Sequence, residues 1–480
     1  MVKMHKVIWM SYVVVCFLCT ACSVDSIKPN YGNYPDAIGE IMVLKCAQGG
    51  CHNTQSADAA SGLDLSTWQG LFKGSKSGSA VIPFSSKFSS LCYFVNTYSA
   101  LGATATPVMP LNQSPLSFKE VNVIKTWIDQ GAPDIKGQIA FSDPFQSYAY
   151  VVNQGCDVVT VIDRKSGLPI RYVEVGNKPG PDIPHQVKVS PDGKFWYVVF
   201  LNNSILQQFD AVNNSLVAEI PLCPSQNTVI DWNTLVINEA GNRAYAVSWS
   251  NNGKIAAVDL KSRNLLHFTS GLYQPHGICL SPDESQLLIT CQTGNLIYEM
   301  DTALVNYRSI VLDSSISFRL DPHDIQCHPD NNDIWISCQH SNEVRVYEWP
   351  AWNLKSKVQV GIYPQELCFS KVQNAFYVSC TQDPYPGSNM LGSVVKIDAR
   401  TFFQRKLYIG YQPHGIIADD ENNMLWVVSR NLDATGPLPH HSAQCSGRNG
   451  FLNAVDLNRF IPETKRVELS VDPYFISIKP

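Results

Sequence analysis

Most of this chain consists of short hydrophobic runs separated by turn residues. Runs such as residues 158–162, 195–199 and 287–289 are bounded by segments rich in Gly, Pro, Asp and Asn. Short apolar runs of this kind, enriched in Val, Ile, Tyr and Trp, are typical of β-strands. Between residues 34 and 135 the apolar residues recur instead at the spacing of a helix face. The pattern predicts a helical segment followed by an all-β segment, with a boundary near residue 135.

One unit repeats along the all-β segment. Four copies begin with a Pro-His pair, and the first strand leads through a turn into a second hydrophobic strand and then a third that commonly ends in Asp. The aligned copies supply one anchor residue each: His185, Asn233, His276, His323, Gln365, His414 and Tyr474. Neighbouring anchors are 42 to 60 residues apart, the range of β-propeller blades. Seven anchors predict seven blades.

The two ends of the all-β segment complete each other. Residues 473–478 form a first strand with nothing after it, whereas residues 148–153 and 158–163 begin the segment without a first strand. Pairing them would close the ring and remove exposed sheet edges. Residues 150–153 (Tyr-Val-Val-Asn) and 377–380 (Tyr-Val-Ser-Cys) make this repeat resemble the YVTN family of bacterial β-propellers. The resemblance implies a propeller over residues 136–480 and little about function.

Helical signals bound the segment before residue 135. Pro35 and Asp36 can open a helix that carries Ile38 and Ile41 on one face. Further on, Ser117 and Glu120 have the spacing of a capping box, and the helix carries Val121, Ile124, Trp127 and Ile128 until Gly131 and Pro133 stop it. We therefore expect a small all-α domain.

The loop after the first helix carries the most specific motif of the chain. Cys46 and Cys51 are followed directly by His52, and two thiols followed by an imidazole form the attachment pattern of a c-type haem. Four residues separate the thiols instead of the usual two, and Gly49 and Gly50 would allow the longer loop to bulge. A zinc site and a disulfide between the two cysteines are the alternatives.

A second axial ligand for the iron is available. Met109, in Pro107-Val108-Met109-Pro110, is the one plausible thioether in this segment, because Met42 is too close to the attachment loop. A zinc site would need further Cys or His ligands, and only Cys92 remains, in an apolar run. The order of helix, haem loop, Met109-Pro110 and final helix resembles the monohaem cytochrome c domains of bacterial periplasmic proteins. The resemblance covers about residues 34–135 and implies one covalent haem c with His52 and Met109 as axial ligands.

The start of the chain indicates export. Lys3 and Lys6 precede an apolar stretch from residue 7 to about 20, and Ala21-Cys22 follows. Residues 1–21 therefore fit a lipoprotein signal peptide, with Cys22 lipidated and residues 22–33 as a tether. Leu18 is one place further from Cys22 than the lipoprotein pattern prefers, so an ordinary secretory signal is the alternative. Either way we expect a protein of the bacterial periplasm or cell envelope, and the first reading anchors it to a membrane by lipid.

Composition narrows the function by exclusion. The chain has 480 residues with 36 basic and 41 acidic side chains and a net charge of −5, so it has no nucleic-acid footprint. It contains no Gly-rich phosphate loop, serine nucleophile elbow or zinc-protease helix, which leaves hydrolytic chemistry without support.

The propeller holds weaker candidates. The inner-strand anchors should ring one mouth of the central channel, and four of them are histidines that could bind a metal: His185, His276, His323 and His414. The plainer interpretation is that each imidazole forms hydrogen bonds within the strand layer. A long insertion, residues 435–450, adds His440, His441 and Cys445, which could close a metal site over the channel, face the haem segment, or simply dock the two domains.

These observations combine into one expectation and one alternative. We expect a multidomain protein, a small all-α cytochrome c domain over residues 34–135 followed by an all-β, seven-bladed β-propeller over residues 136–480. Its haem would relay electrons, and its propeller would bind a redox partner protein or a small electron donor or acceptor. The alternative is an oxidoreductase with a metal or other redox centre in the propeller channel, fed by the haem.

Overall fold

The computed structural model describes residues 29–143, 147–225, 228–441 and 445–479. The features below belong to the compact unit Tyr31–Pro480. The predicted signal peptide (residues 1–21), the lipidation site Cys22 and most of the predicted tether lie outside the described residues. Every helix within the described ranges is too short or too polar to cross a membrane.

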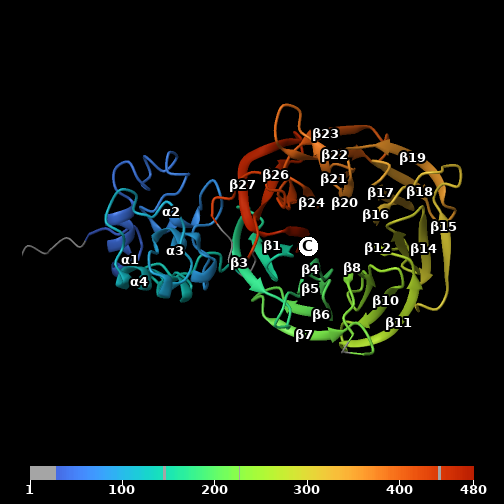
Figure 1. Cartoon of the computed structure of the whole chain (residues 1–480), viewed down its shortest axis with the longest axis horizontal. Helices are drawn as coiled ribbons and strands as arrows, with labels where there is room; N and C mark the ends of the chain where they lie inside the picture. The colour runs from blue at the N-terminus through green and yellow to red at the C-terminus, as the bar shows by residue number, and fades with distance from the viewer. Residues whose placement is uncertain (1–28, 144–146, 226–227, 442–444, 480) are drawn as a thin grey trace, which may run out of the picture. The chain divides into compact units, whose positions relative to one another are not determined.

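Seven four-stranded antiparallel sheets form a seven-bladed β-propeller, as the seven anchors predicted (Figure 1). In blade order, from the innermost strand outward, the strands of the first four sheets are β28 (Pro473–Ile478), β1 (Tyr148–Asn153), β2 (Val158–Asp163), β3 (Leu168–Glu174); β4 (Pro184–Val189), β5 (Phe195–Phe200), β6 (Asn203–Asp210), β7 (Leu216–Pro221); β8 (Trp232–Ile237), β9 (Arg243–Ser248), β10 (Gly253–Asp259), β11 (Asn264–Leu272); and β12 (Pro275–Leu280), β13 (Gln286–Cys291), β14 (Leu296–Asp301), β15 (Tyr307–Val311). The other three are β16 (Pro322–Cys327), β17 (Asp333–Cys338), β18 (Glu343–Glu348), β19 (Asn353–Gln359); β20 (Pro364–Ser370), β21 (Ala375–Pro384), β22 (Leu391–Asp398), β23 (Gln404–Tyr408); and β24 (Pro413–Asp419), β25 (Met424–Ser429), β26 (Asn449–Asp456), β27 (Ile461–Val471).

The ring closes by joining both ends of the segment in one sheet. Strand β28 pairs antiparallel with β1, with Val151 opposite Ile476. The inner strands of successive blades lie side by side around the ring, and β28 lies between β24 and β4. Apolar side chains fill the spaces between blades, as where Trp196 stacks on Phe209 at 3.9 Å and Trp335 on Phe376 at 4.2 Å. The predicted closure is therefore confirmed.

A β-bulge recurs near the start of the inner strands. In β20 the pairing passes from Pro364 opposite Cys380 to Leu367 opposite Val378, so one extra residue lies on the inner strand. The same shift occurs in β12, β16 and β24. At the bulge the two-residue alternation of side chains fails, which allows consecutive residues to point toward the channel.

The predicted all-α domain over residues 34–135 is wrong. Only α4 (Phe118–Asp129) reaches 12 residues. The other helical elements are α1 (Asp36–Ile41), the π-helical turn η1 (Met42–Cys46), α2 (Trp68–Phe72), η2 (Ser86–Phe88), α3 (Ser90–Val95) and η3 (Ser99–Leu101). Much of the rest is irregular because short polar side chains bond to nearby backbone groups, as Asn53 and Asp64 do to the amides of Ser56 and Ser66.

The sequence-predicted elements of this region are partly confirmed. Ser117 and Glu120 form the capping box at the start of α4, and Val121, Ile124, Trp127 and Ile128 are its buried face. The first predicted helix is shorter than its apolar pattern suggested, because the α-helix gives way to a π-turn after Ile41 that leads to Cys46. These elements pack around one apolar core that also includes Tyr34 and Leu71.

Hydrogen bonds and a ring stack tie this region to the outer strands of the propeller. The amide of Glu468, on β27, donates to the carbonyl oxygen of Ser77 at 2.8 Å. The hydroxyl of Ser79 donates to the carbonyl oxygen of Pro169, on β3, at 2.6 Å. Phe88 stacks on Tyr172 of β3 with 4.7 Å between ring centroids. The irregular region therefore takes part of its order from the sheets of the propeller.

Candidate functional sites

Cys46, Cys51, His52 and Met109 all line one pocket of about 420 Å³. We call it the cysteine–histidine pocket. Its other walls are mainly apolar and include Leu63, Leu65, Ala80, Leu91, Phe94, Val95, Pro107 and Leu111. Pockets of 300–1,000 Å³ with apolar walls and a few polar groups are typical of cofactor sites. The sequence predicts these four residues as haem ligands. They span more than sixty positions of the chain and line the same pocket.

The ring of His52 is held in a defined orientation. Its Nδ1 lies 3.2 Å from the carbonyl oxygen of Leu63, which accepts a hydrogen bond when Nδ1 carries the proton. Burial lowers the pKa of His52, so the neutral ring is favoured. This tautomer leaves a lone pair on Nε2, which is the state of a metal-binding imidazole braced by a backbone carbonyl.

Met109 and the two thiols are placed by the same local structure. The amide of Met109 donates to the carbonyl oxygen of Phe94 at 2.8 Å, which fixes the extended loop against α3. Cys46 ends the π-turn and is buried, and burial raises the pKa of its thiol to about 12. Cys51 is half-buried, and no neighbour of either Gly49 or Gly50 comes within 4 Å of a Cβ built there. The loop between the thiols therefore has open space around it.

The geometry counts against the two alternatives for this motif. Cys46 and Cys51 are both free thiols, so no disulfide joins them. Within the described residues, Cys46, Cys51 and His52 do not form a cluster compact enough to hold one metal ion. The donor groups are spread around a cavity, which suits a large planar cofactor better than a bare ion.

The long insertion of the last blade reaches this pocket. His440 and His441 line it beside Cys51 and Met109, although both lie far away in sequence. The ring of His440 lies 5.1 Å from that of Phe94, and the ring of His441 lies 5.6 Å from that of Tyr93. Of the three interpretations of the insertion, the structure favours the one in which it faces the cysteine–histidine segment.

Cys445, a predicted metal-ligand candidate, has another role. It forms a disulfide with Cys156, at the turn between β1 and β2. A disulfide sulfur has no thiolate to offer a metal, so this candidate was wrong. The carboxylate of buried Glu468 accepts from the His440 amide at 2.7 Å and from the Asn449 amide group at 2.6 Å. The disulfide and Glu468 together hold the insertion against the pocket.

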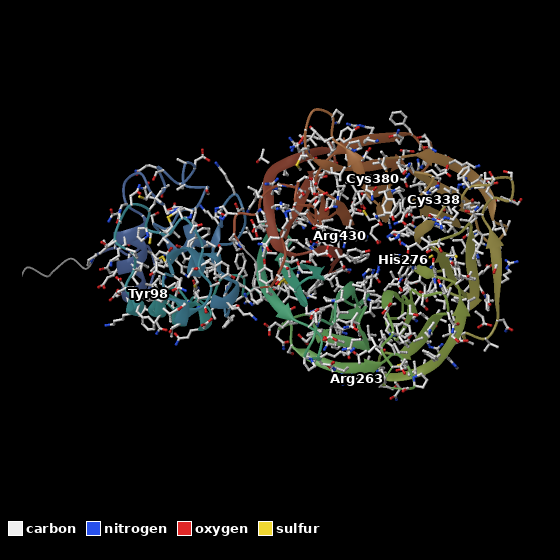
Figure 2. All side chains as sticks on the ribbon, viewed as in Figure 1. Tyr98, Arg263, His276, Cys338, Cys380 and Arg430 are labelled. Carbon is white, nitrogen blue, oxygen red and sulfur yellow. A yellow bond between two sulfur atoms is a disulfide. The ribbon has the colours of Figure 1, made fainter. Side chains whose placement is uncertain are left out.

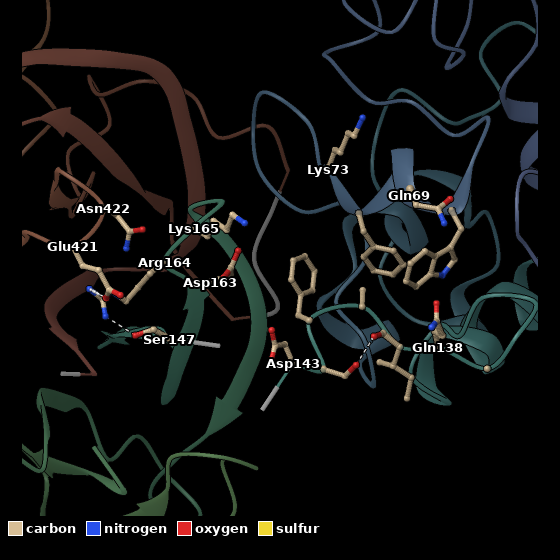
Figure 3. A pocket seen from close by; sticks show the side chains of 17 residues that line it. Gln69, Lys73, Gln138, Asp143, Ser147, Asp163, Arg164, Lys165, Glu421 and Asn422 are labelled. Atoms are coloured by element: carbon tan, nitrogen blue, oxygen red, sulfur yellow. Dashed lines mark hydrogen bonds and ion pairs between the residues drawn. The ribbon is translucent and has the colours of Figure 1, made fainter. Parts of the chain in front are cut away.

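A larger cavity of about 920 Å³ lies elsewhere and lacks these groups. Figure 3 shows Arg164, Asp163 and Lys165 on one side of it and Gln69 and Lys73 on the other. Arg164 is already paired with buried Asp419, so its charge is not available to a ligand. We find no convergent donor set among the described residues of this cavity and assign it no chemistry.

The propeller histidines meet at the channel. Each anchor is the second residue of an inner strand, and Figure 2 shows His276 toward the centre of the blades. We call His185, His276, His323, His414 and Tyr474 the channel ring. Their rings are in succession: His185 to Tyr474 at 4.4 Å, Tyr474 to His414 at 3.7 Å, His414 to His323 at 5.7 Å, His323 to His276 at 4.0 Å and His276 to His185 at 6.2 Å.

Two of these histidines form hydrogen bonds within the layer of inner strands, as the plainer interpretation expects. His276 Nδ1 lies 3.3 Å from the carbonyl oxygen of His323, and His414 Nδ1 lies 3.2 Å from that of Tyr474. Each bond links one blade to an inner strand further along the chain. The glycine after each histidine allows this approach, because a Cβ on Gly277 would lie 2.4 Å from the same His323 oxygen. The repeated Pro-His-Gly start is thus explained by packing.

Glu366 is a channel residue that sequence reasoning missed. Its Oε1 lies 3.4 Å from Nε2 of His323 and 3.9 Å from Nδ1 of His414. The repeat alignment predicts its neighbour Gln365 as the anchor, and strict alternation would turn Glu366 away from the channel. The bulge between Pro364 and Leu367 removes that alternation. A Gln-Glu pair at the position where other copies have His-Gly or His-Asp was the available signal.

Comparisons with known proteins identify the fold. No model of a protein family matches this chain, and no curated protein matches it. Hydrazine synthase from Kuenenia stuttgartiensis is 14% identical over 64% of this chain and 92% of its own, with a TM-score of 0.51. A functionally unknown protein from Desulfotomaculum acetoxidans is 13% identical over 69% of this chain and 98% of its own, with a TM-score of 0.51. Such low identity shows a shared β-propeller fold alone. The resemblances to YVTN propellers and monohaem cytochromes stay predictions.

Proposed function

We propose that this chain is a haem-binding electron-transfer protein of the bacterial cell envelope. Cys46 and Cys51 would hold one haem covalently, and His52 and Met109 would be the axial ligands of its iron. The observation that carries the proposal is that two free thiols, a braced neutral imidazole and a thioether line one largely apolar pocket. This is the donor chemistry of a c-type haem, independent of whether the surrounding backbone is helical.

The residues of this chain have separate tasks around the cofactor. When bound, haem supplies a one-electron iron couple. The Leu63 carbonyl oxygen orients His52, and the Phe94 carbonyl oxygen fixes the backbone of Met109. The apolar walls exclude water, which with the axial ligands tunes the potential of the iron. Gln48, Gly49 and Gly50 are exposed, so a partner can approach the attachment loop.

Exposed apolar side chains near this pocket fit a transient partner. Leu44, Leu111 and Leu438 are 52%, 54% and 80% exposed, and each lines the pocket or is within two residues of one that does. Small apolar patches with a polar rim are typical of short-lived protein contacts. We propose that a redox partner protein docks here and on the adjoining propeller face.

The disulfide between Cys156 and Cys445 supports a location in the cell envelope. Disulfides persist in the periplasm and at cell surfaces and are rare in the reducing cytosol. With the predicted lipoprotein signal and lipidation at Cys22, we propose a lipid-anchored protein of the cell envelope.

Haem attachment is tested by expressing the full chain with a cytochrome c maturation system. Denatured, solvent-extracted protein should retain a haem stain on a gel, and the variant Cys46→Ser/Cys51→Ser should lose it. Cys92→Ser is the matched control, because Cys92 is a buried thiol of the same core. No stain in the unsubstituted protein, or equal stain in the double variant, would refute the proposal.

The axial ligands are tested by absorption spectra of the ferric protein. Met109→Ala should abolish the far-red band of sulfur-ligated haem, whereas His440→Ala and His441→Ala, which alter the same pocket, should retain it. Persistence of the band in Met109→Ala removes Met109 from the ligand set. Loss of the band only in a propeller-histidine variant would move the role to the insertion.

A further inference from the structure

Three side chains from three successive blades converge inside the channel. His323 on β16, Glu366 on β20 and His414 on β24 each offer one ligand atom, and these atoms lie within 4.8 Å of one another. The three residues are 1%, 4% and 1% exposed. In the described part of the chain, this is the one cluster of three or more His, Cys, Asp or Glu side chains compact enough for a metal ion. It lies outside the cysteine–histidine pocket.

The cluster contains a donor atom without a partner. Nε2 of His323 makes no hydrogen bond although it is fully buried, and its nearest acid oxygen, on Glu366, lies at 3.4 Å. A buried polar atom left unpaired is unfavourable, and in native proteins such an atom usually has a specific role. Nδ1 of the same ring lies 3.1 Å from the side-chain amide nitrogen of Gln292. The unpartnered nitrogen is therefore the one that faces Glu366.

The ring of His414 is held in place by Tyr474. Nδ1 of His414 lies 3.2 Å from the Tyr474 carbonyl oxygen, and the His414 ring stacks on the Tyr474 ring at 3.7 Å. The same Nδ1 lies 3.9 Å from Glu366 Oε1, so the Tyr474 carbonyl oxygen fixes the orientation of the His414 ring at the edge of the cluster. Nε2 of His323 offers its lone pair to a metal ion when Nδ1 carries the proton and the side-chain amide of Gln292 is turned so that its oxygen accepts.

We propose that His323, Glu366 and His414 bind one divalent transition-metal ion in the propeller channel, with a remaining coordination position for water or a small ligand. Two imidazoles and one carboxylate form the protein donor set of open zinc and non-haem iron sites. His185 and His276 belong to the channel ring but not to this donor set. The proposal does not depend on haem binding.

Zinc is a suitable probe because it is redox-inactive and accepts nitrogen and oxygen ligands. The purified full chain is stripped with a chelator, titrated with Zn²⁺ against a chromophoric competitor, and analysed for metal per chain. The unsubstituted protein should bind one zinc ion more than Glu366→Gln, or bind it at least about tenfold more tightly. Zinc should also raise the melting temperature of the unsubstituted protein and not that of Glu366→Gln.

Controls separate this site from the other metal-binding groups. His185→Gln removes an equally buried imidazole of the channel ring and should retain the zinc. Cys46→Ser/Cys51→Ser should retain it too, so failure of haem binding and failure of this proposal remain distinguishable. His414→Gln replaces Glu366→Gln if the latter does not fold. The proposal is overturned if Glu366→Gln and His414→Gln bind zinc as the unsubstituted protein does. It is also overturned if either control variant loses the zinc.

Discussion

The buried ion pair between Arg164 and Asp419 is expected to hold the propeller ring closed. Arg164 follows β2 in the closing blade, and Asp419 ends β24 in the neighbouring blade. Their side chains are 4% and 0% exposed, and Arg164 Nε donates to Asp419 Oδ2 at 2.9 Å while Nη2 bonds to Oδ1. Arg164 also donates to the carbonyl oxygen of Lys479 at 2.8 Å, beyond the last strand. One guanidinium thus links two blades and the end of β28.

The substitution Asp419→Asn tests how much this ion pair stabilises the closed ring. The amide keeps the volume of the carboxylate but leaves the buried Arg164 charge without its main counter-ion. Breaking a buried pair from one side costs about 3–5 kcal/mol, and we expect the lower end because Glu421 Oε2 remains 3.2 Å from the guanidinium. Glu421→Gln is the matched control, since that carboxylate is 74% exposed and its loss should cost less than about 1 kcal/mol.

The difference in free energy of unfolding between the unsubstituted protein and Asp419→Asn should also depend on pH. Burial alone raises the pKa of Asp419, but hydrogen bonds from Arg164 and Asn422 outweigh it and hold the pKa below its usual value of about 3.8. A carboxyl with a depressed folded-state pKa stabilises the fold above its unfolded pKa, and this contribution disappears as the pH falls through the folded value. The gap in stability between the unsubstituted protein and Asp419→Asn should therefore be full at pH 7 and shrink below about pH 4.

Denaturant unfolding followed by tryptophan fluorescence measures the free energies, with the slope compared between variants to check that the same surface unfolds. Replacing both partners by apolar residues, Arg164→Met/Asp419→Leu, should restore most of the loss, because the cost comes from an unpaired buried charge. The reasoning is refuted if Asp419→Asn costs no more than Glu421→Gln, or if the gap persists unchanged at acid pH.

Three further predictions concern other parts of the fold. Cys445→Ser should remove a disulfide that spans 289 residues and cost about 2–5 kcal/mol; reductant should lower the melting temperature of the unsubstituted protein and not that of the variant. Ser117→Ala should remove the capping box of α4 and cost about 1 kcal/mol, seen as faster hydrogen exchange in its first turn, and unchanged exchange there would contradict the assignment. Gly277→Ala should destabilise the propeller by about 1–3 kcal/mol, because its Cβ would lie 2.4 Å from the His323 carbonyl oxygen; Gly180→Ala, with open space, should not.

The propeller was predictable because its information is local and repeated. A strand has a two-residue period, and a four-stranded blade repeats it with turns at similar places, so one alignment of anchors such as His276 and His414 determined blade number and closure. The helix α4 was predictable for the same kind of reason, since capping box and apolar face coincide.

The features that could not be predicted depend on contacts between residues far apart in the sequence. The region before the propeller has helical signals at both ends, but its middle is ordered by polar side chains and by contacts with β3 and β27, which no local period reveals. The contact of His441 with the cysteine–histidine pocket is of the same kind. Glu366 was missed because a single bulge residue changes which side chains face the channel.

Joining both termini of the ring in one blade makes folding depend on the final strand of the ring. Strand β28 is synthesised after the other strands of the ring, yet it supplies the innermost layer of the first blade. Until it arrives, β1 exposes an unpaired edge and Tyr474 is missing from the channel. A product that stops before Pro473 therefore has six complete sheets and a seventh that lacks its inner strand.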